Sequence, residues 1–280
     1  MTGDRFLVSR GLRLRVRSFG GGAPAAVLLH GWLDHLGSLD GLGPLLAPCA
    51  ALEFRGHGAS DRAPPGGFYH FVEYLADLDG ALDALGLDKV RLVGHSLGGS
   101  VSLLYAAARP GRVEHATLID AVPLTVGPEE VPLRLATWLD ELKAPRRRRL
   151  VASVEEAADR LRRFNPRLEA AAARHLAGQG VAPDPEQEGK LAWLWDPLLR
   201  AHSPMPFTEP ALQAAVAQVK APVLVIRGGS GFMPEAEAVR SRFAALPRLR
   251  VETIEGGSHH LHLERPGEVA AIIREDWARL

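Results

Sequence analysis

The sequence predicts an α/β protein, built on a mostly parallel sheet with helices on both faces and interrupted by an inserted helical cap. Short apolar strands alternate with helical patterns over residues 1–122, which is typical of a parallel sheet covered by helices. Residues 123–208 show helical segments and no clear strand, and strands return in residues 209–280. We therefore expect a core formed by residues 1–122 and 209–280, with residues 123–208 as a helical cap, or lid.

The first half of the chain supplies five expected strands and two expected helices. Leu12–Val16 alternates apolar and polar residues, which indicates a half-buried strand. Ala25–Leu29 is a continuous apolar run, the pattern of a strand covered on both faces. Helical spacing of apolar residues predicts helices over Phe71–Leu85, which Gly86 ends, and over Leu97–Arg109. The further expected strands are Ala50–Phe54, Val90–Val93 and Ala116–Ile119.

The last part of the chain repeats this alternation. Val223–Ile226 and Val251–Ile254 are apolar runs of strand length, and we expect both to join the sheet. A final helix is expected to begin near Pro266, because proline suits the first turn of a helix. The same sheet is therefore expected to continue after the cap.

Composition excludes several classes of protein. The chain has 280 residues, of which 46% are hydrophobic and 24% charged, the balance of a globular protein. Lys and Arg together number 33 and so do Asp and Glu, so no global basic field favours nucleic acid. Cys49 is the single cysteine, which excludes an internal disulfide. With no apolar secretory signal and no transmembrane-length run, we expect a soluble cytoplasmic protein without a membrane partner.

A run of four arginines, Arg146–Arg149, interrupts the expected cap. Such a run fits either a nucleic-acid patch or the solvated face of a helix. Acidic residues, among them Glu155, Glu156 and Asp159, follow closely and favour the solvated helical face. We expect no nucleic-acid partner.

The strongest local pattern is Gly94-His95-Ser96-Leu97-Gly98, which follows an expected strand and opens an expected helix. This is the G-x-S-x-G arrangement of a nucleophile elbow in the context that the motif requires. A serine at such a strained turn needs small neighbours, and the N–H groups that follow it point toward whatever its Oγ attacks. A tight turn without chemistry is the alternative. We expect Ser96 to be a nucleophile.

A second pattern, His30-Gly31-Trp32, follows the buried strand Ala25–Leu29. Acyl transfer needs two N–H donors directed at the developing oxyanion. We expect these donors to be the backbone N–H groups of Leu97, directly after the nucleophile, and of Trp32. Asp34 and His35, which follow the turn, either line the pocket or cap the loop.

Four segments of the chain carry a family pattern: HGW at 30–32, RGHGAS at 55–60, GHSLGG at 94–99 and GGSHHLHLERP at 256–266. Together they resemble the α/β-hydrolase superfamily and appear in its order, which implies an eight-stranded α/β-hydrolase sheet. A narrower pattern consists of HGWLD at 30–34, WDPLLRAHSP at 195–204 and HHLHLE at 259–264. It resembles the serine hydrolase-like branch, which has no defined substrate to carry over.

The general base is expected in the C-terminal loop, because a serine hydroxyl needs an imidazole to accept its proton. The family pattern places this histidine five residues before Glu264 and seven before Pro266, which selects His259. His260 stays an alternative, and His262 is expected to be structural. A metal site on the H-H-x-H pattern competes, but the segment has no carboxylate-rich partner motif nearby. We therefore expect no metal and no cofactor.

The acid departs from the family pattern. In many relatives an Asp follows the strand after the cap, but here that position falls on Gly231, and the next carboxylate is Glu235. Asp120 ends the strand before the cap, where an acid serves the histidine in the haloalkane dehalogenases, which share the fold. The order Ser96, Asp120, His259 agrees with the family order. We expect Asp120 to be the acid; the alternatives are Glu235, and a capping role for Asp120.

The sequence therefore predicts a cofactor-independent, carboxylesterase-like serine hydrolase that cleaves an ester or related acyl compound through an acyl-enzyme on Ser96. The same residues would serve thioester hydrolysis, C–C bond hydrolysis or acyl transfer. A non-catalytic protein that binds a small molecule is the alternative that the missing acid at Gly231 suggests. Serine at the elbow argues against a dehalogenase or epoxide hydrolase, which need a carboxylate there. The expected partner is a small acyl substrate; the pattern indicates no oligomeric state.

Overall fold

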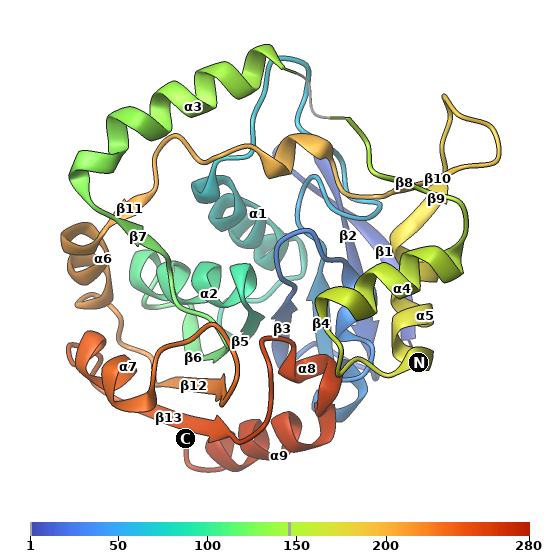
Figure 1. Ribbon diagram of the computed structural model, residues 1–280. Coiled ribbons are helices and arrows are strands. Elements are labelled where there is room, and N and C mark those ends of the chain that lie inside the picture. Colours follow the sequence, from blue (N-terminus) through green and yellow to red (C-terminus); the bar gives the residue numbers. More distant parts are fainter. Residues whose placement is uncertain (1, 145–146) are drawn as a thin grey trace.

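A computed structural model of the protein describes residues 2–144 and 147–280 (Figure 1). Its main feature is an eight-stranded sheet in the order β1-β2-β4-β3-β5-β6-β12-β13. β1 pairs with β2, and β2 with β4, in antiparallel fashion, and the other neighbours pair in parallel. The strands, in chain order, are β1 (Thr2–Ser9), β2 (Leu12–Phe19), β3 (Ala26–Leu29), β4 (Cys49–Leu52), β5 (Val90–His95), β6 (Val113–Ile119), β12 (Val223–Gly228) and β13 (Leu249–Ile254).

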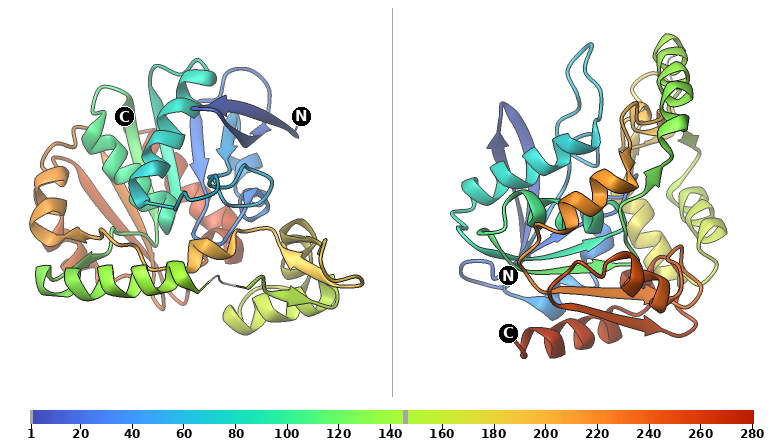
Figure 2. Two further views of the ribbon diagram at one scale, coloured as in Figure 1. Left: turned by 90° about the horizontal axis from the view of Figure 1, so that it is seen from above. Right: turned by 90° about the vertical axis from the view of Figure 1, so that its left-hand side faces the viewer.

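Helices cover both faces of the sheet (Figure 2). Side chains of β12 alternate between the two faces of the sheet. Val223 and Val225 pack into the hydrophobic core on one face, and Leu224 and Ile226 pack into the core on the opposite face. The predicted α/β class, with a mostly parallel sheet between two layers of helices, is confirmed. One layer contains α1 (Phe71–Ala84), α2 (Leu97–Ala108), α6 (Glu209–Val216) and α7 (Ala236–Arg242). The other contains α8 (Leu261–Glu264), α9 (Pro266–Trp277) and the 3₁₀ turns η1 (Leu36–Leu39) and η2 (Gly43–Leu46).

The strands and helices expected in the core are present, with small shifts at their ends. β4 ends at Leu52, before the predicted end at Phe54. α1 ends at Ala84, and Gly86 follows with φ of 69°, a left-handed conformation that glycine adopts without strain. β1, which the sequence patterns did not predict, pairs with β2 at the edge of the sheet. Its side chains alternate imperfectly because much of this edge strand is exposed.

Between the neighbouring strands β6 and β12 lies a long intervening segment on one side of the sheet (Figure 2). The expectation that it has no strand was wrong, because β8, β10 and β9 form a small sheet and β11 pairs with β7. These strands have only two or three residues each, too few to produce an alternating pattern. Its elements are β7 (Thr125–Val126), η3 (Pro128–Glu130), α3 (Val131–Lys143), β8 (Leu150–Val151), α4 (Val154–Phe164), α5 (Ala170–Gly180), β9 (Val181–Pro183), β10 (Leu191–Trp193), η4 (Pro197–Arg200) and β11 (Phe207–Thr208).

The helices of the intervening segment pack in two ways. α4 and α5 share a small core of their own, which includes Ala157, Ala173 and Leu176. α3 has no buried side chain along its length. That residues 123–208 act as a separate cap stays a prediction.

Two expectations about partners can be compared with the structure. Arg146, the first residue of the arginine run, lies outside the described residues. The run was expected on a helix, but its described residues precede β8 in irregular chain, where Arg148 pairs with Asp184 at 3.1 Å and Glu186 at 3.4 Å. No helix in the described part of the chain combines the length and apolar character needed to span a bilayer.

Candidate active site

Ser96 occupies the sharp turn between β5 and α2. Its backbone has φ of 49° and ψ of −111°, a conformation that L residues adopt only when the surrounding structure holds it. The glycines on either side are required, because a Cβ on Gly94 would lie 2.2 Å from the carbonyl of Gly98. A Cβ on Gly98 would in turn lie 2.4 Å from the carbonyl oxygen of Leu29. The strand, strained turn and helix expected around Ser96 are therefore present.

The turn at residues 30–32 lies directly against this serine. A Cβ added to Gly31 would be 3.6 Å from the Cβ of Ser96. The N–H of Leu97 is the first of α2, where amide groups have no acceptor within the helix. The amide of Trp32 belongs to the turn, and the amide of Leu97 to the first turn of α2. The two predicted oxyanion donors thus lie on the two backbone segments that border Ser96.

Two buried histidines support the turn. His30 donates from Nδ1 to the carbonyl of Gly31 (2.7 Å) and accepts at Nε2 from the Phe54 amide (3.1 Å). His57 accepts at Nε2 from the amide of Leu33, at 3.2 Å. Burial lowers the pKa of His30 to about 4 and the pKa of His57 to about 3. Both rings are therefore neutral near pH 7, which leaves Nε2 free to accept.

Asp120 and His259, far apart in the chain, form a buried pair. His259 Nδ1 lies 2.7 Å from Asp120 Oδ2. The carboxylate also accepts from the amides of Gly228 and Phe232, each at 3.0 Å, and its side chain is fully buried. Asp120 sits directly after β6 with φ of 42°, a left-handed conformation that aspartate tolerates. A carboxylate bound to Nδ1 keeps the proton there and leaves the lone pair of Nε2 available as a base.

Gly231, where the family pattern places the acid, lies against this carboxylate. A Cβ added to Gly231 would be 2.3 Å from Oδ1 and 2.6 Å from Oδ2 of Asp120. Positions 120 and 231 therefore direct a side chain into the same small volume, and only one of them can hold an acid. The side chain of Glu235, the other candidate acid, is 85% exposed and forms an ion pair with Arg227 at 3.4 Å.

The loop that carries His259 is held by hydrogen bonds to Glu264, which lies on its C-terminal side. Glu264 accepts from the amide of Ser258 at 3.0 Å and from its hydroxyl, and from the side-chain amide of Asn165 at 2.9 Å. Asn165 directly follows α4, so the intervening segment contacts this loop. His260, the alternative base, lies with its ring 5.1 Å from that of His259, measured between centroids. Of these two histidines, His259 is the one that contacts the buried carboxylate.

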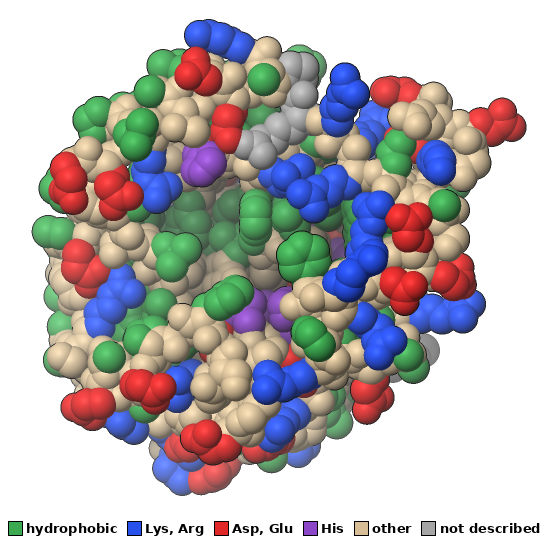
Figure 3. All heavy atoms as spheres, in the orientation of Figure 1, with side chains coloured by type: hydrophobic (Ala, Val, Ile, Leu, Met, Phe, Trp, Pro, Cys, Tyr) green, Lys and Arg blue, Asp and Glu red, His purple; other side chains and the backbone are tan. Residues whose placement is uncertain are grey.

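Exposed apolar side chains lie near the candidate site. The surface is hollowed in the middle of one face, where hydrophobic side chains line the hollow and histidine side chains lie at its edge (Figure 3). Phe232 is 83% exposed, yet its ring lies 4.3 Å from that of His259. Trp32 is 53% exposed, and its indole N–H donates to the carbonyl of Leu199 at 3.0 Å. Exposed apolar groups beside buried polar ones are typical of a site for a small organic ligand.

Comparisons with known proteins extend over nearly the whole chain. The model of the alpha/beta hydrolase family matches residues 26–272. A serine hydrolase-like protein of Danio rerio is 29% identical, over 88% of this chain and 79% of its own length. A pimeloyl-acyl-carrier-protein methyl ester esterase of Nitrosomonas europaea is 30% identical, over 88% of this chain and 92% of its own. The crystal structure of a hypothetical protein from Pseudomonas aeruginosa PAO1 has a TM-score of 0.89 and 30% identity, covering 98% of this chain and 99% of that one.

Proposed function

The chain belongs to the alpha/beta hydrolase family, in its serine hydrolase-like branch, and from this premise we propose that it is a cofactor-independent, carboxylesterase-like serine hydrolase. The observation that carries the proposal is the 2.7 Å contact between His259 Nδ1 and the buried carboxylate of Asp120. A serine hydroxyl becomes a useful nucleophile only when an oriented imidazole accepts its proton. The strained turn at Ser96 and this oriented ring are the two parts that such a reaction requires.

The proposed reaction has two halves. Ser96 Oγ attacks the ester carbonyl while His259 Nε2 takes the hydroxyl proton, and the Asp120 carboxylate stabilises the imidazolium. The amides of Trp32 and Leu97 donate to the oxyanion of the tetrahedral intermediate. Its collapse breaks the C–O bond, and the alcohol leaves with the proton from His259. Water then attacks the acyl-enzyme, His259 accepts a proton from that water and returns it to Ser96 Oγ, and the acid is released.

The surroundings of the proposed triad favour a substrate with an apolar portion. Phe232 presents an exposed aromatic ring beside His259, and Trp32 presents another from the turn next to Ser96. Such rings contribute contact area rather than charge recognition. An ester is preferred because the Nitrosomonas europaea relative is named as an ester esterase. Thioester hydrolysis, C–C bond hydrolysis and acyl transfer would use the same side chains. The carboxylate of Asp120 beside His259 supports catalysis over a binding protein that lacks an acid.

The test is hydrolysis of short-chain nitrophenyl esters by the wild type, Ser96→Ala and Ser241→Ala. Ser241 is an exposed serine on α7 and is the matched control. We expect Ser96→Ala to lower kcat by about 10⁴-fold or more, and Ser241→Ala to keep the wild-type rate. A fluorophosphonate probe should label the wild type and Ser241→Ala but not Ser96→Ala. Wild-type hydrolysis by Ser96→Ala, or no hydrolysis and no labelling of folded wild type, would overturn the proposal.

A further inference from the structure

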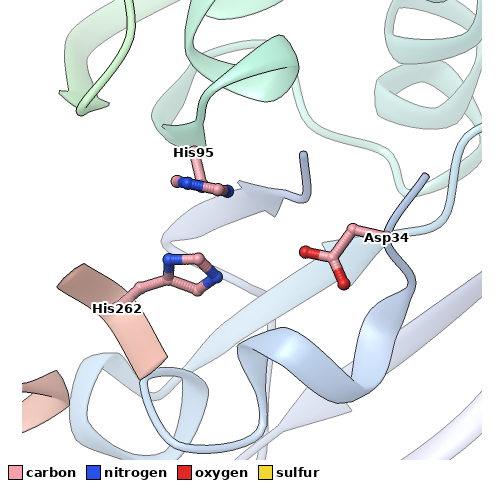
Figure 4. Close-up of side chains that lie close together, drawn as sticks. All are labelled: Asp34, His95 and His262. Carbon is pink, nitrogen blue, oxygen red and sulfur yellow. The ribbon is translucent and has the colours of Figure 1, made fainter. Parts of the chain in front are cut away.

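A second group of polar side chains beside Ser96 is not used in the proposed reaction. It consists of Asp34, which precedes η1, His95 at the end of β5, and His262 in α8 (Figure 4). One carboxylate oxygen and two ring nitrogens, one from each residue, lie within 4.8 Å of one another. The carboxylate of Asp34 points toward the two rings. Three segments that are distant in the sequence therefore direct donor atoms into one volume.

The two histidines of this cluster are buried without enough partners. The side chain of His262 is completely buried, and neither of its ring nitrogens has a hydrogen-bond partner among the described residues. Nδ1 of His95 is also buried, and within the described part of the chain it too lacks a partner. A buried polar atom without a hydrogen bond destabilises the fold, because it has lost its contact with water. One such nitrogen from each histidine belongs to the cluster, beside the carboxylate of Asp34, which indicates that something else occupies the space between them.

The hydrogen bond of His95 Nε2 indicates which kind of ligand would suit the unpartnered Nδ1. His95 Nε2 donates to the carbonyl oxygen of His259 at 2.9 Å, which places the proton on Nε2 and the free lone pair on Nδ1. Histidines that bind metals are commonly held in this way, with the second ring N–H bound to a backbone carbonyl. A Cβ on Gly31 would lie 2.8 Å from Nδ1. Glycine at position 31 therefore leaves open the space that a ligand of this nitrogen needs.

We propose that Asp34, His95 and His262 bind one divalent transition-metal ion of the zinc class. Two imidazole nitrogens and one carboxylate oxygen are ligands that Zn²⁺ prefers, with a fourth position left for water. At metal–ligand distances of about 2.0–2.1 Å, tetrahedral geometry places donor atoms about 3.4 Å apart. The donors would therefore approach one another by at most about 1.4 Å from the present limit of 4.8 Å.

Sequence patterns pointed away from this site for a clear reason. The H-H-x-H segment at 259–262 lacked a nearby carboxylate motif, and His95 stood at a variable position of the G-x-S-x-G motif. The fold supplies the carboxylate from the turn after β3 and uses only His262 of the C-terminal segment. The alternative occupant is a buried water molecule, which would satisfy the same lone pairs.

The test measures metal binding directly and does not depend on hydrolysis. Chelator-treated protein is titrated with Zn²⁺ by calorimetry and with Co²⁺ by visible absorption. His262→Gln keeps a polar side chain of similar length but removes the imidazole, and His175→Gln alters an exposed histidine that pairs with Asp40. We expect one ion per chain in the wild type and in His175→Gln, with an affinity at least about 100-fold lower in His262→Gln.

Either of two results would overturn the proposal. Absence of stoichiometric binding by the folded wild type would mean that water occupies the site. Equal affinity in the wild type and His262→Gln would mean that the ion binds elsewhere. If circular dichroism shows that His262→Gln does not fold, Asp34→Asn takes its place. This variant removes one ligand charge and should weaken Zn²⁺ binding by at least about tenfold, and unchanged affinity would again overturn the site.

Discussion

Two groups of histidines in the molecule differ in the groups that their ring nitrogens contact. In the C-terminal loop, His259 Nδ1 faces the buried carboxylate of Asp120 at 2.7 Å. At and next to the turn at 30–32, His30 and His57 each accept an amide N–H at Nε2. Burial lowers the pKa of His30 to about 4 and the pKa of His57 to about 3. A carboxylate stabilises a protonated ring, whereas an amide donor binds only the neutral one. The same side chain is therefore suited to proton transfer in one place and to support in the other.

The cluster of Asp34, His95 and His262 extends this contrast. In it a carboxylate lies near two imidazoles, as Asp120 lies near His259, yet three ring nitrogens lack a hydrogen-bond partner among the described residues. Both arrangements contain a carboxylate near an imidazole. They differ in whether the carboxylate is hydrogen-bonded to the ring, as Asp120 is to His259. Three predictions test the contrast between His259 and the supporting histidines: two change the acid beside His259, and one replaces His57.

The largest expected effect comes from removal of the charged partner of His259. In Asp120→Asn the side-chain amide can donate to Nδ1, which places the ring proton on Nε2, and it carries no negative charge. The ring then cannot accept the serine proton at Nε2, and the imidazolium is no longer stabilised. We expect kcat for nitrophenyl esters to fall by about 10⁴-fold. Glu235→Gln is the control, since this exposed acid pairs with Arg227, and its rate should stay within about twofold of wild type. A loss below tenfold in Asp120→Asn would place the acid elsewhere.

A smaller effect is expected when the carboxylate is moved rather than removed. Positions 120 and 231 direct side chains into one volume, and φ of 42° at residue 120 suits glycine. The double variant Asp120→Gly with Gly231→Asp should therefore regain at least about tenfold in kcat over Asp120→Gly alone. Gly231→Asp alone crowds two carboxylates and should lower the free energy of unfolding by about 2–4 kcal/mol.

Steady-state kinetics and urea unfolding of the three variants measure these effects. The same low activity in Asp120→Gly and in the double variant would show that residue 231 cannot deliver an acid to His259. A stable Gly231→Asp variant would contradict the shared volume.

The smallest effect concerns the supporting histidines and appears as pH dependence of stability. An unfolded histidine has a pKa near 6.5, above the value of about 3 for His57 in the fold. Between these values the unfolded state binds more protons, so stability present above pH 6.5 is lost as pH falls toward 3. Each such histidine contributes about 1.4 kcal/mol per pH unit.

His57→Gln isolates this contribution. The glutamine amide can still accept from Leu33, but it does not titrate. The slope of unfolding free energy against pH, measured by urea denaturation between pH 4.5 and 6, should decrease by about 1.4 kcal/mol per pH unit. Equal slopes in the wild type and His57→Gln would mean that His57 is not held in its neutral form by burial in the folded protein.

Much of the fold could be predicted because the relevant information is local. The runs Ala26–Leu29 and Val223–Ile226 lie within strands covered on both faces, and a strand buried in this way must be apolar along its whole length. The short strands of the intervening segment and the exposed edge strand β1 escaped prediction, because neither burial nor length imposes a pattern on them. The resemblance at the four family segments supplied the expectation of an eight-stranded sheet.

Local sequence is sufficient for the features whose physics acts over a few residues: the buried strands, and the glycines without which the turn at Ser96 cannot close. Contacts between distant side chains depend on the folded arrangement of the whole chain. It joined Asp120 to His259, left Glu235 exposed, and brought Asp34 and His262 beside His95. The reason is that parallel strands place their carboxyl ends at one edge of the sheet whatever their separation in the chain, so contacts there depend on strand order and loop packing.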